Sequence, residues 1–548
     1  MAIKRYKASK DTTISNSYDF SLLPRNRATG SNMGAADTLE IFSIYGQVSS
    51  SGKQEAVGLS SELSRVLIGF PVSGSTETIG SDRNAGKIPV SGNVKFFLRM
   101  FNAKHAATTP RNIKLVVAAV SASADWEEGT GIDLDEYKDK THDEEGANWI
   151  RYASNKSWDR PGGTFYIDST SSYTTTLEKG DEDIELDVTS IVEYWLKPEG
   201  NAQRRENRGF AVFLTSSQEA YHSASKGYNL SLFQGQGATG SVIHNPAGAK
   251  RSYYTKKFFA RTSEFFFKQP VLEARWDSTV KDRRGDCHYS SSMVSAQDNL
   301  NTIYLYNYVR GRLQNIPSIG TGEIFVTLYS GSADNNSPSI NTIKLPQGGG
   351  VSGPAHTLIT GGYVSTGIYS ASFAITAASN PLSRVFDVWH SEIPIGEAQP
   401  ATEFWTGSIN VKAFKSYTNA PSFEYVTAIP NLKASYSKTE VARFRLYVRD
   451  KDWNPNIYTK ATNTPDNTII ESGSFKVVRL QDNLNVISYG TGSNRHTHTS
   501  FDVSGNYFDL DMDLLQEDYT YGIKLAYYND HIGGWTEQPE IFKFRVED

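Results

Sequence analysis

The chain has 548 residues, of which 38% are hydrophobic and 21% are charged, and its formal net charge is −5. This composition excludes a disordered tail, and no apolar run is long enough to cross a bilayer, so we expect several domains with cores of their own and no membrane. The small net charge gives no field that would attract a nucleic-acid backbone, so we expect no nucleic-acid partner.

Apolar and polar residues alternate with a period of two along the chain, which predicts β-strands with one face in a core. Near the start, one apolar face consists of Val94, Phe96, Leu98 and Met100. The same pattern follows at Phe210-Val212-Leu214, Ile324-Val326-Leu328, Ala442-Phe444-Leu446-Val448 and Phe542-Phe544-Val546. Turn residues bound each run, so the fold class is predicted to be all-β and built from sandwiches.

One local signal indicates a helix. Ser190 and Glu193 have the spacing of a capping box, and Ile191, Tyr194 and Trp195 then fall on one face before Pro198. We expect a turn or two of helix that crosses the end of a sandwich, because long helices do not alternate with strands here.

Three domains are expected from the places where the strand patterns close. The predicted units are residues 1–278, 279–430 and 431–548, with a polar, charged stretch from Asp277 to Asp286 at the first boundary. No repeat of fixed period occurs, which argues against a propeller or solenoid.

Cys287 is the single cysteine, so no intrachain disulfide can form, and an inert buried thiol is the favoured interpretation. The start of the chain is basic but lacks the apolar stretch of a secretion signal. We therefore expect synthesis in a cytoplasm without export.

The first unit resembles the DNRLRE jelly-roll β-sandwich module of bacterial surface and carbohydrate-handling proteins. The resemblance rests on motifs that occur in the same order: Asp11-Thr12-Thr13-Ile14, Asn32-Met33-Gly34, Leu63-Ser64-Arg65-Val66-Leu67-Ile68-Gly69-Phe70, Asp125-Trp126-Glu127, Trp149, Asp187-Val188-Thr189, Trp195, Gly209-Phe210 and Pro270-Val271-Leu272-Glu273. It implies a jelly-roll-like first sandwich. Segments 131–145 and 228–250 have the character of insertions and put an inherited ligand site in doubt.

The whole chain is also similar to virion structural proteins of large tailed phages, especially the T4-like marine phages, including its run from Arg445 to Pro455. This likeness implies a structural component of the capsid, neck or tail, assembled as a symmetric homo-oligomer with other virion proteins. The alternative is a carbohydrate-binding or adhesion protein that docks on a host glycan. The two sandwiches after the first are expected to be immunoglobulin-like.

Metal binding has two candidate positions. The acidic residues Asp133, Asp135, Glu136, Asp139, Asp143, Glu144 and Glu145 could suit calcium, but they lack the ligand spacing and the turn glycine of a calcium loop. His496 and His498 lie two apart and would point the same way on a strand, yet no third ligand is evident. We expect no metal and no cofactor.

Catalytic machinery is not evident either. No serine lies in a glycine elbow, and no glycine-rich phosphate loop opens a long helix. Asp125 and Glu127 beside Trp126 are the place to look for a glycosidase pair, although a packing role for Trp126 is the stronger interpretation. The chain is therefore predicted not to be an enzyme.

Aromatic residues are the remaining candidates. Tyr304, Tyr306 and Tyr308 would share one strand face, where they could stack on a sugar, on an adjacent domain or on another subunit. Packing on a domain or a subunit is favoured. The interface candidates are Tyr304, Tyr306, Trp405 and Trp453.

Overall fold

The computed structural model describes residues 2–19, 26–27, 29–46, 61–74, 76–104, 111–132, 146–222, 243–291, 293–352, 356–376, 382–392, 402–412, 424–451, 467–529 and 532–548. Strands hold 46% of these residues and helices 6%. The all-β prediction is confirmed. Among the described residues, no helix is long and apolar enough to span a membrane.

Two compact units make up the chain, Ala2–Trp276 and Asp277–Asp548. Within the second unit, the sheets fall into one group before residue 413 and another after residue 424. The predicted three-domain division, with boundaries after residues 278 and 430, stays a prediction.

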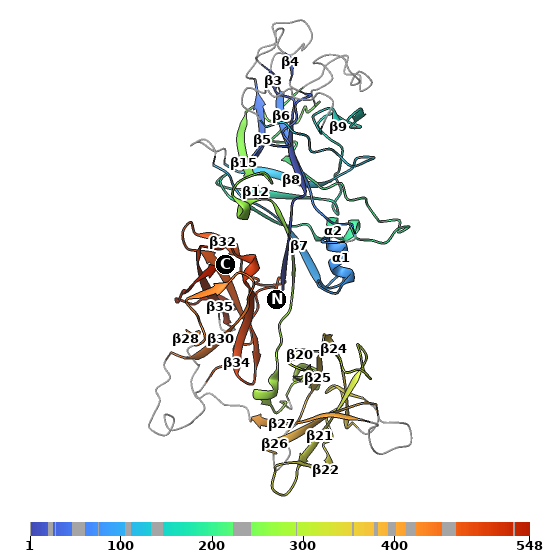
Figure 1. Cartoon of the computed structure of the whole chain (residues 1–548), viewed down its shortest axis with the longest axis vertical. Coiled ribbons are helices and arrows are strands. Elements are labelled where there is room, and N and C mark those ends of the chain that lie inside the picture. The colour runs from blue at the N-terminus through green and yellow to red at the C-terminus, as the bar shows by residue number, and fades with distance from the viewer. Residues whose placement is uncertain are drawn as a thin grey trace. The chain divides into compact units, whose positions relative to one another are not determined.

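The first unit contains an eight-stranded and a four-stranded antiparallel sheet (Figure 1). The larger sheet has the order β11-β8-β14-β6-β5-β15, with β12 beside β8 and β2 beside β6. Its strands are β2 (Lys10–Ser15), β5 (Thr38–Tyr45), β6 (Ser61–Gly69), β8 (Ile113–Val120), β11 (Phe165–Tyr166), β12 (Ser172–Leu177), β14 (Phe210–Leu214) and β15 (Tyr253–Phe259). The smaller sheet, ordered β1-β16-β7-β13, contains β1 (Ile3–Lys7), β7 (Val94–Met100), β13 (Ile184–Asp187) and β16 (Val271–Trp276). Two short ladders pair β3 (Tyr18–Asp19) with β4 (Asn26–Arg27) and β9 (Arg151–Ala153) with β10 (Lys156–Ser157).

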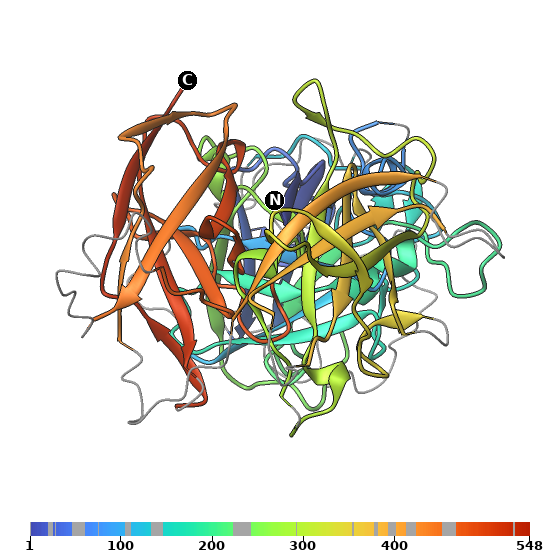
Figure 2. The ribbon, with the colours of Figure 1, turned by 90° about the horizontal axis from the view of Figure 1, so that it is seen from below.

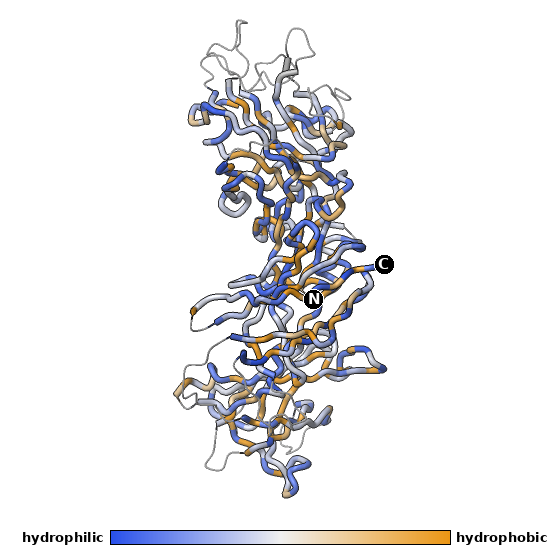
Figure 3. The backbone as a smooth tube through the Cα atoms, turned by 90° about the vertical axis from the view of Figure 1, so that its left-hand side faces the viewer, coloured by the Kyte–Doolittle hydropathy of each residue, from blue (hydrophilic) through white to orange (hydrophobic). Residues whose placement is uncertain are grey.

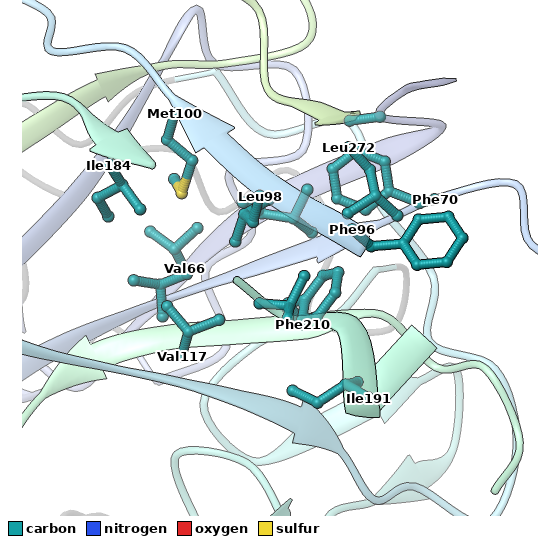
Figure 4. Close-up of a cluster of buried hydrophobic side chains, with 14 of the residues drawn as sticks. Val66, Phe70, Phe96, Leu98, Met100, Val117, Ile184, Ile191, Phe210 and Leu272 are labelled. Carbon is teal, nitrogen blue, oxygen red and sulfur yellow. The ribbon is translucent and has the colours of Figure 1, made fainter. Parts of the chain in front are cut away.

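The main core of this unit lies between its two sheets. Figure 4 shows Val66, Val117 and Phe210 of the large sheet pointing toward Leu98 and Leu272 of the small one. A second cluster, which includes Trp126, Trp149 and Trp158, covers the opposite face of the large sheet. Because both faces are covered, every residue of β6 is buried, and its sequence shows no simple alternation.

Helices are short, and the prediction for them was partly wrong. The predicted helix is α2 (Thr189–Trp195), but its N-cap is Val188 rather than Ser190, and a valine side chain has no oxygen that could cap it. The Ser190 hydroxyl donates to the Thr170 carbonyl oxygen. The buried residues of α2 are Ile191, Val192 and Trp195. A second helix, α1 (Ile79–Asn84), was missed, although Thr78 and Ser81 form its capping box. Single 3-10 turns are η4 (Phe266–Lys268), η5 (Arg283–Gly285), η6 (Ala296–Asp298) and η7 (Met512–Leu514).

In the second unit, the first group of strands forms a nine-stranded sheet with the order β17-β27-β26-β21-β24-β25-β18. Its strands are β17 (Cys287–His288), β18 (Asn301–Tyr306), β21 (Ile324–Gly331), β22 (Pro338–Thr342), β23 (Val351–Ser352), β24 (Leu358–Ser365), β25 (Ile368–Phe373), β26 (Arg384–His390) and β27 (Glu403–Lys412). A separate hairpin pairs β19 (Tyr308–Val309) with β20 (Arg312–Leu313). Ile303, Val326, Tyr369, Phe373 and Trp389 are among the residues of the core.

The second group, orange to red in Figure 2, forms a four-stranded and a six-stranded sheet. The four-stranded sheet contains β28 (Tyr425–Ala428), β30 (Val441–Asp450), β33 (Ser500–Asp502) and β34 (Gly505–Asp511). The six-stranded sheet contains β29 (Ser435–Ser437), β31 (Gly473–Arg479), β32 (Leu484–Ile487), β35 (Thr520–Asn529), β36 (Gly534–Glu537) and β37 (Phe542–Glu547). Phe508 of one sheet stacks on Phe475 of the other, with ring centroids 4.2 Å apart, so the two sheets share an aromatic core.

The predicted register of β30 is confirmed. Ala442, Phe444, Leu446 and Val448 are buried, whereas the residues between them are exposed or half-buried. The same alternation is visible as orange and blue bands along many strands in Figure 3. It arises because this strand has a core on one face only.

Candidate functional site

Asn32, in the Asn32-Met33-Gly34 motif of the first unit, joins three segments of the chain. Its Nδ2 donates to the carbonyl oxygens of Glu128 and Ala147 at 2.7 and 2.8 Å, and its Oδ1 accepts from the Gly34 N–H at 3.0 Å. A Cβ on Gly34 would lie 2.1 Å from the Glu128 carbonyl oxygen. Both donors of the Asn32 amide are thus used, one to join the 29–46 segment to 111–132 and the other to join it to 146–222, so its role here is structural.

The carboxylates beside Trp126 point to separate partners. Asp125 Oδ1 lies 2.7 Å from Lys10 Nζ, and Glu127 Oε2 accepts from the Ser154 N–H at 3.0 Å. Trp126 is buried, and its Nε1 donates to the Arg208 carbonyl oxygen at 2.8 Å. Trp126 therefore packs in the second core, as its stronger interpretation predicted, and both acids are held in contacts within the fold.

A buried titratable group lies next to these motifs. Asp11 Oδ2 accepts the Arg261 N–H at 2.6 Å, while the Asp11 N–H donates to Glu128 Oε1 at 2.8 Å. Arg261 also binds Glu128 through two hydrogen bonds of 3.0 and 2.8 Å. Burial raises the pKa of Asp11 to about 7, so this carboxyl group changes charge near neutral pH.

Tyr304 and Tyr306 lie on one face of β18, with ring centroids 6.4 Å apart, but the prediction that Tyr308 shares this strand face was wrong, because β18 ends at Tyr306 and Tyr308 belongs to β19. Both rings are half-buried. Burial raises the pKa of Tyr304, which also hydrogen-bonds to the Lys281 backbone, and burial raises the pKa of Tyr306 beside Tyr507 and Asp282. These two rings therefore pack within the second unit; a role for them between subunits stays a prediction.

Residues 277–286 connect the strand groups of the second unit. The Val280 carbonyl oxygen accepts the Phe501 N–H at 3.0 Å, and the Asp282 N–H donates to the Phe501 carbonyl oxygen at 3.0 Å. This segment therefore runs parallel to β33 as an added edge. The next turn, η5, carries Arg284, whose guanidinium forms two hydrogen bonds of 2.8 and 2.7 Å with Asp387 of β26.

Trp405 of β27 is paired with the core residue Trp389 of β26, and 41% of it is exposed. The Arg284 guanidinium carbon is 4.6 Å from its ring centroid, and a Cβ on Gly407 would lie 2.0 Å from the ring. The ring thus lies along the strand over Gly407. Tyr308, on β19, is 60% exposed. Trp453 lies outside the described residues.

Of the two candidate metal positions, the structure describes only His496 and His498. Among the residues that the structure describes, no group of three His, Cys, Asp or Glu side chains could hold a metal ion. His496 is buried, and the His498 ring lies 5.5 Å from that of Trp535, while burial lowers the pKa of His498. The acidic positions from Asp133 to Glu145 lie outside the described residues.

Cys287 is buried in the core of the second unit, and burial raises the pKa of its thiol to about 12. A thiol that stays protonated is a poor nucleophile. The inert interpretation of this residue agrees with its surroundings.

Sequence reasoning missed several buried charges. Lys256 lies inside β15 with 1% of its surface exposed, and Arg65 pairs with Glu219 at 2.8 Å. In β16, Glu273 contacts three arginines at 2.5 to 3.0 Å: Arg5, Arg99 and Arg275. The sequence held a sign of the buried Lys256: it lies two residues before Phe258, so both side chains belong to the same, core-facing side of the strand. A lysine in such a position is unusual.

Comparison with known proteins gives little more. No protein-family model and no curated protein matches the chain. Among solved structures, the N-terminal Ig1-2 module of the Drosophila receptor protein tyrosine phosphatase DLAR aligns over 45% of this chain and 91% of that chain, with 8% identity and a TM-score of 0.13. The tandem Ig repeats of Dlar align over 40% and 81%, with 10% identity and a TM-score of 0.12. At such TM-scores the likeness carries no argument about function.

Proposed function

We propose that the chain is a structural component of a tailed-bacteriophage virion, in the capsid, neck or tail, and that it acts through protein–protein interfaces. The observation that carries the proposal is the exposure of neighbouring aromatic side chains on ordered elements. Phe265 and Phe266, next to and within η4, are 52% and 62% exposed, and the Phe265 ring lies 5.2 Å from that of Phe259.

Such aromatic groups are typical of the centres of protein interfaces, where their large area contributes much of the binding energy. Lys7 Nζ lies 6.0 Å from the Phe266 ring, and Lys268 Nζ lies 5.6 Å from the Phe259 ring, so basic groups border the aromatic ones. The phage assignment itself depends on the sequence likeness described above. Copies in such a particle surround a shared axis or occupy equivalent lattice points.

The test asks whether the chain is present in purified particles and which proteins it contacts there. Mass spectrometry of purified particles should find the chain, and crosslinking should join it to its own copies and to a second virion protein. The double variant Phe265→Ser, Phe266→Ser should be incorporated less, whereas Ile167→Ser, at an exposed position that is 74% accessible, should be incorporated normally. A monomer that is absent from particles would overturn the proposal.

A carbohydrate-binding or adhesion role is the second candidate. The exposed rings of Trp405 and Tyr308 favour it, because flat aromatic faces on a strand suit the apolar face of a sugar. A glycan array with the full chain tests this role. A specific signal that Trp405→Ala or Tyr308→Ala abolishes supports it, and silence on the array together with incorporation into particles rejects it.

A further inference from the structure

A buried lysine and an asparagine meet where the two sheets of the first unit come together. Lys256 belongs to β15, at one edge of the large sheet, and Asn102 follows β7 of the small sheet. Asn102 is joined to Phe258 by an isolated β-bridge, and the Phe258 ring centroid is 4.7 Å from Lys256 Nζ. The two side chains therefore approach each other from different sheets beside an aromatic ring.

The distance between the reacting groups is short. Lys256 Nζ lies 2.5 Å from Asn102 Oδ1. Because a carbonyl bond is about 1.23 Å long, Asn102 Cγ can be no more than about 3.7 Å from Nζ. This value is close to the separation of about 3–3.5 Å at which bound groups are poised to react, where effective molarities become very large.

The protein surroundings of Lys256 favour the neutral form of its amine more than water would. Burial lowers the pKa of Lys256 to about 8, even though the carboxylates of Asp183, Glu182 and Asp181 oppose that shift. At pH 7 about one amine in ten is then unprotonated and able to attack a carbonyl carbon.

A carboxylate stands beside the asparagine. Asp183 Oδ1 accepts the Asn102 backbone N–H at 2.7 Å, and Asp183 exerts the strongest of the three acidic fields on Lys256. Carboxylates can relay protons between an attacking and a leaving group. Of the three carboxylates that act on Lys256, Asp183 is the one that is hydrogen-bonded to the Asn102 backbone.

We propose that Lys256 and Asn102 react with each other to form an intramolecular isopeptide bond. Neutral Nζ attacks Asn102 Cγ and forms an N–C bond, while the carbonyl electron pair moves onto oxygen. When that pair returns, the bond from Cγ to Nδ2 breaks. One proton of Nζ passes through Asp183 to Nδ2, which leaves as ammonia. One amide replaces another, and no oxidant or reductant is needed.

The same contacts also suit an unreacted ammonium. Lys256 Nζ lies 2.8 Å from the Glu182 carbonyl oxygen and 3.2 Å from that of Gly180, so three oxygens can receive its protons. The two interpretations differ in covalent mass. The bond would join residues 154 apart and link the two sheets, a property that does not depend on the proposed virion role.

Mass spectrometry of the purified full chain tests the proposal. The intact mass should be lower than that of the sequence by one ammonia, and a digest should contain a branched peptide that joins the Asn102 and Lys256 segments. Lys256→Arg keeps the charge and several of the donors but cannot form the bond, so it should have its full expected mass. A folded wild-type chain that keeps its full mass after prolonged incubation at pH 9 would overturn the proposal.

Two substitutions of acidic residues then test whether Asp183 takes part in the reaction. Asp183→Asn should slow bond formation at least tenfold, within the range of general acid–base effects. Asp181→Asn, which removes an exposed neighbouring charge, should leave the rate nearly unchanged. Equal rates in both variants would remove Asp183 from the mechanism. If a variant fails to fold, the intact mass of the wild-type chain still shows whether the isopeptide bond has formed.

Discussion

Arg284 and Arg283 are adjacent, yet their replacement should have very different effects on stability. Arg284 binds Asp387, whose side chain is 0% exposed and accepts one further hydrogen bond, from Trp389 Nε1 at 2.7 Å. Arg283 Nη2 lies 2.6 Å from Glu471, whose side chain is 62% exposed. The two arginines thus offer a matched comparison of a buried and an exposed ion pair.

In the variant Arg284→Met, the Asp387 carboxylate stays buried, and Trp389 Nε1 is its one remaining hydrogen-bond donor among the described residues. Loss of one partner of a buried pair costs about 3–5 kcal/mol. For the ion pair of Arg283 we expect a loss of about 0–1 kcal/mol in Arg283→Met, because water solvates the carboxylate that remains. Each variant also loses a cation over an aromatic ring, Trp405 for Arg284 and Phe501 for Arg283, so this loss of about 0.5–1 kcal/mol does not distinguish them. The difference between the two variants should therefore be at least 2 kcal/mol, by the same estimates.

Guanidinium unfolding followed by tryptophan fluorescence measures this difference, since Trp389 and Trp405 both border the pair. The chain has more than one unit, so the transition of residues 277–548 must be analysed separately. The double variant Arg284→Met, Asp387→Leu should recover much of the loss, because an apolar pair can replace a buried ion pair. Equal destabilisation by Arg284→Met and Arg283→Met would refute the reasoning.

Three further predictions concern packing, pH and metals. Leu446→Asn should lower the free energy of unfolding by about 3–5 kcal/mol, because it buries an amide and removes apolar contacts. Val441→Asn, on the exposed side of the same strand, should lower it by less than about 1 kcal/mol. Equal midpoints of the two variants in urea unfolding would contradict the register. Because the pKa of Asp11 rises to about 7 on folding, the contribution of Asp11 to wild-type stability should fall as pH increases from 4 to 7. In thermal unfolding, Asp11→Asn should match the wild type at pH 4 and exceed it at pH 8, by up to about 4 kcal/mol, and an advantage at pH 4 alone would be the wrong sign. EDTA should leave the thermal midpoint unchanged, and a fall of more than about 5 °C would instead indicate a metal near the acidic positions 133–145 or at His496 and His498.

The sequence predicted strands best where a strand has one buried face. In β30 the alternation of Phe444 and Leu446 with arginines was enough to assign the fold class and the register. It was less informative at β6, because both faces of the large sheet are covered and every residue of this strand is buried. Helix α1 was missed because Ser81, rather than Glu or Gln, completes its capping box.

For the candidate sites, the sequence supplied residue types and the tertiary structure supplied their neighbours. The period of two was enough to predict that Tyr304 and Tyr306 share one strand face. It could not predict which residues of other strands pack against them. That Trp126 packs within the fold was expected from the resemblance to the jelly-roll module, in which this tryptophan is a core or loop-packing residue. That Asp125 and Glu127 turn to different partners depends on segments from elsewhere in the unit.

Local pattern therefore determined that this protein is built from half-buried strands, because the period of two is a property of each strand alone. The order of strands in the sheets decided which distant residues meet. Lys256 contacts Asn102, and Arg284 contacts Asp387, across separations of 154 and 103 residues. The local sequence around either member of these pairs holds no information about the other, because long-range pairing is fixed by how whole sheets pack.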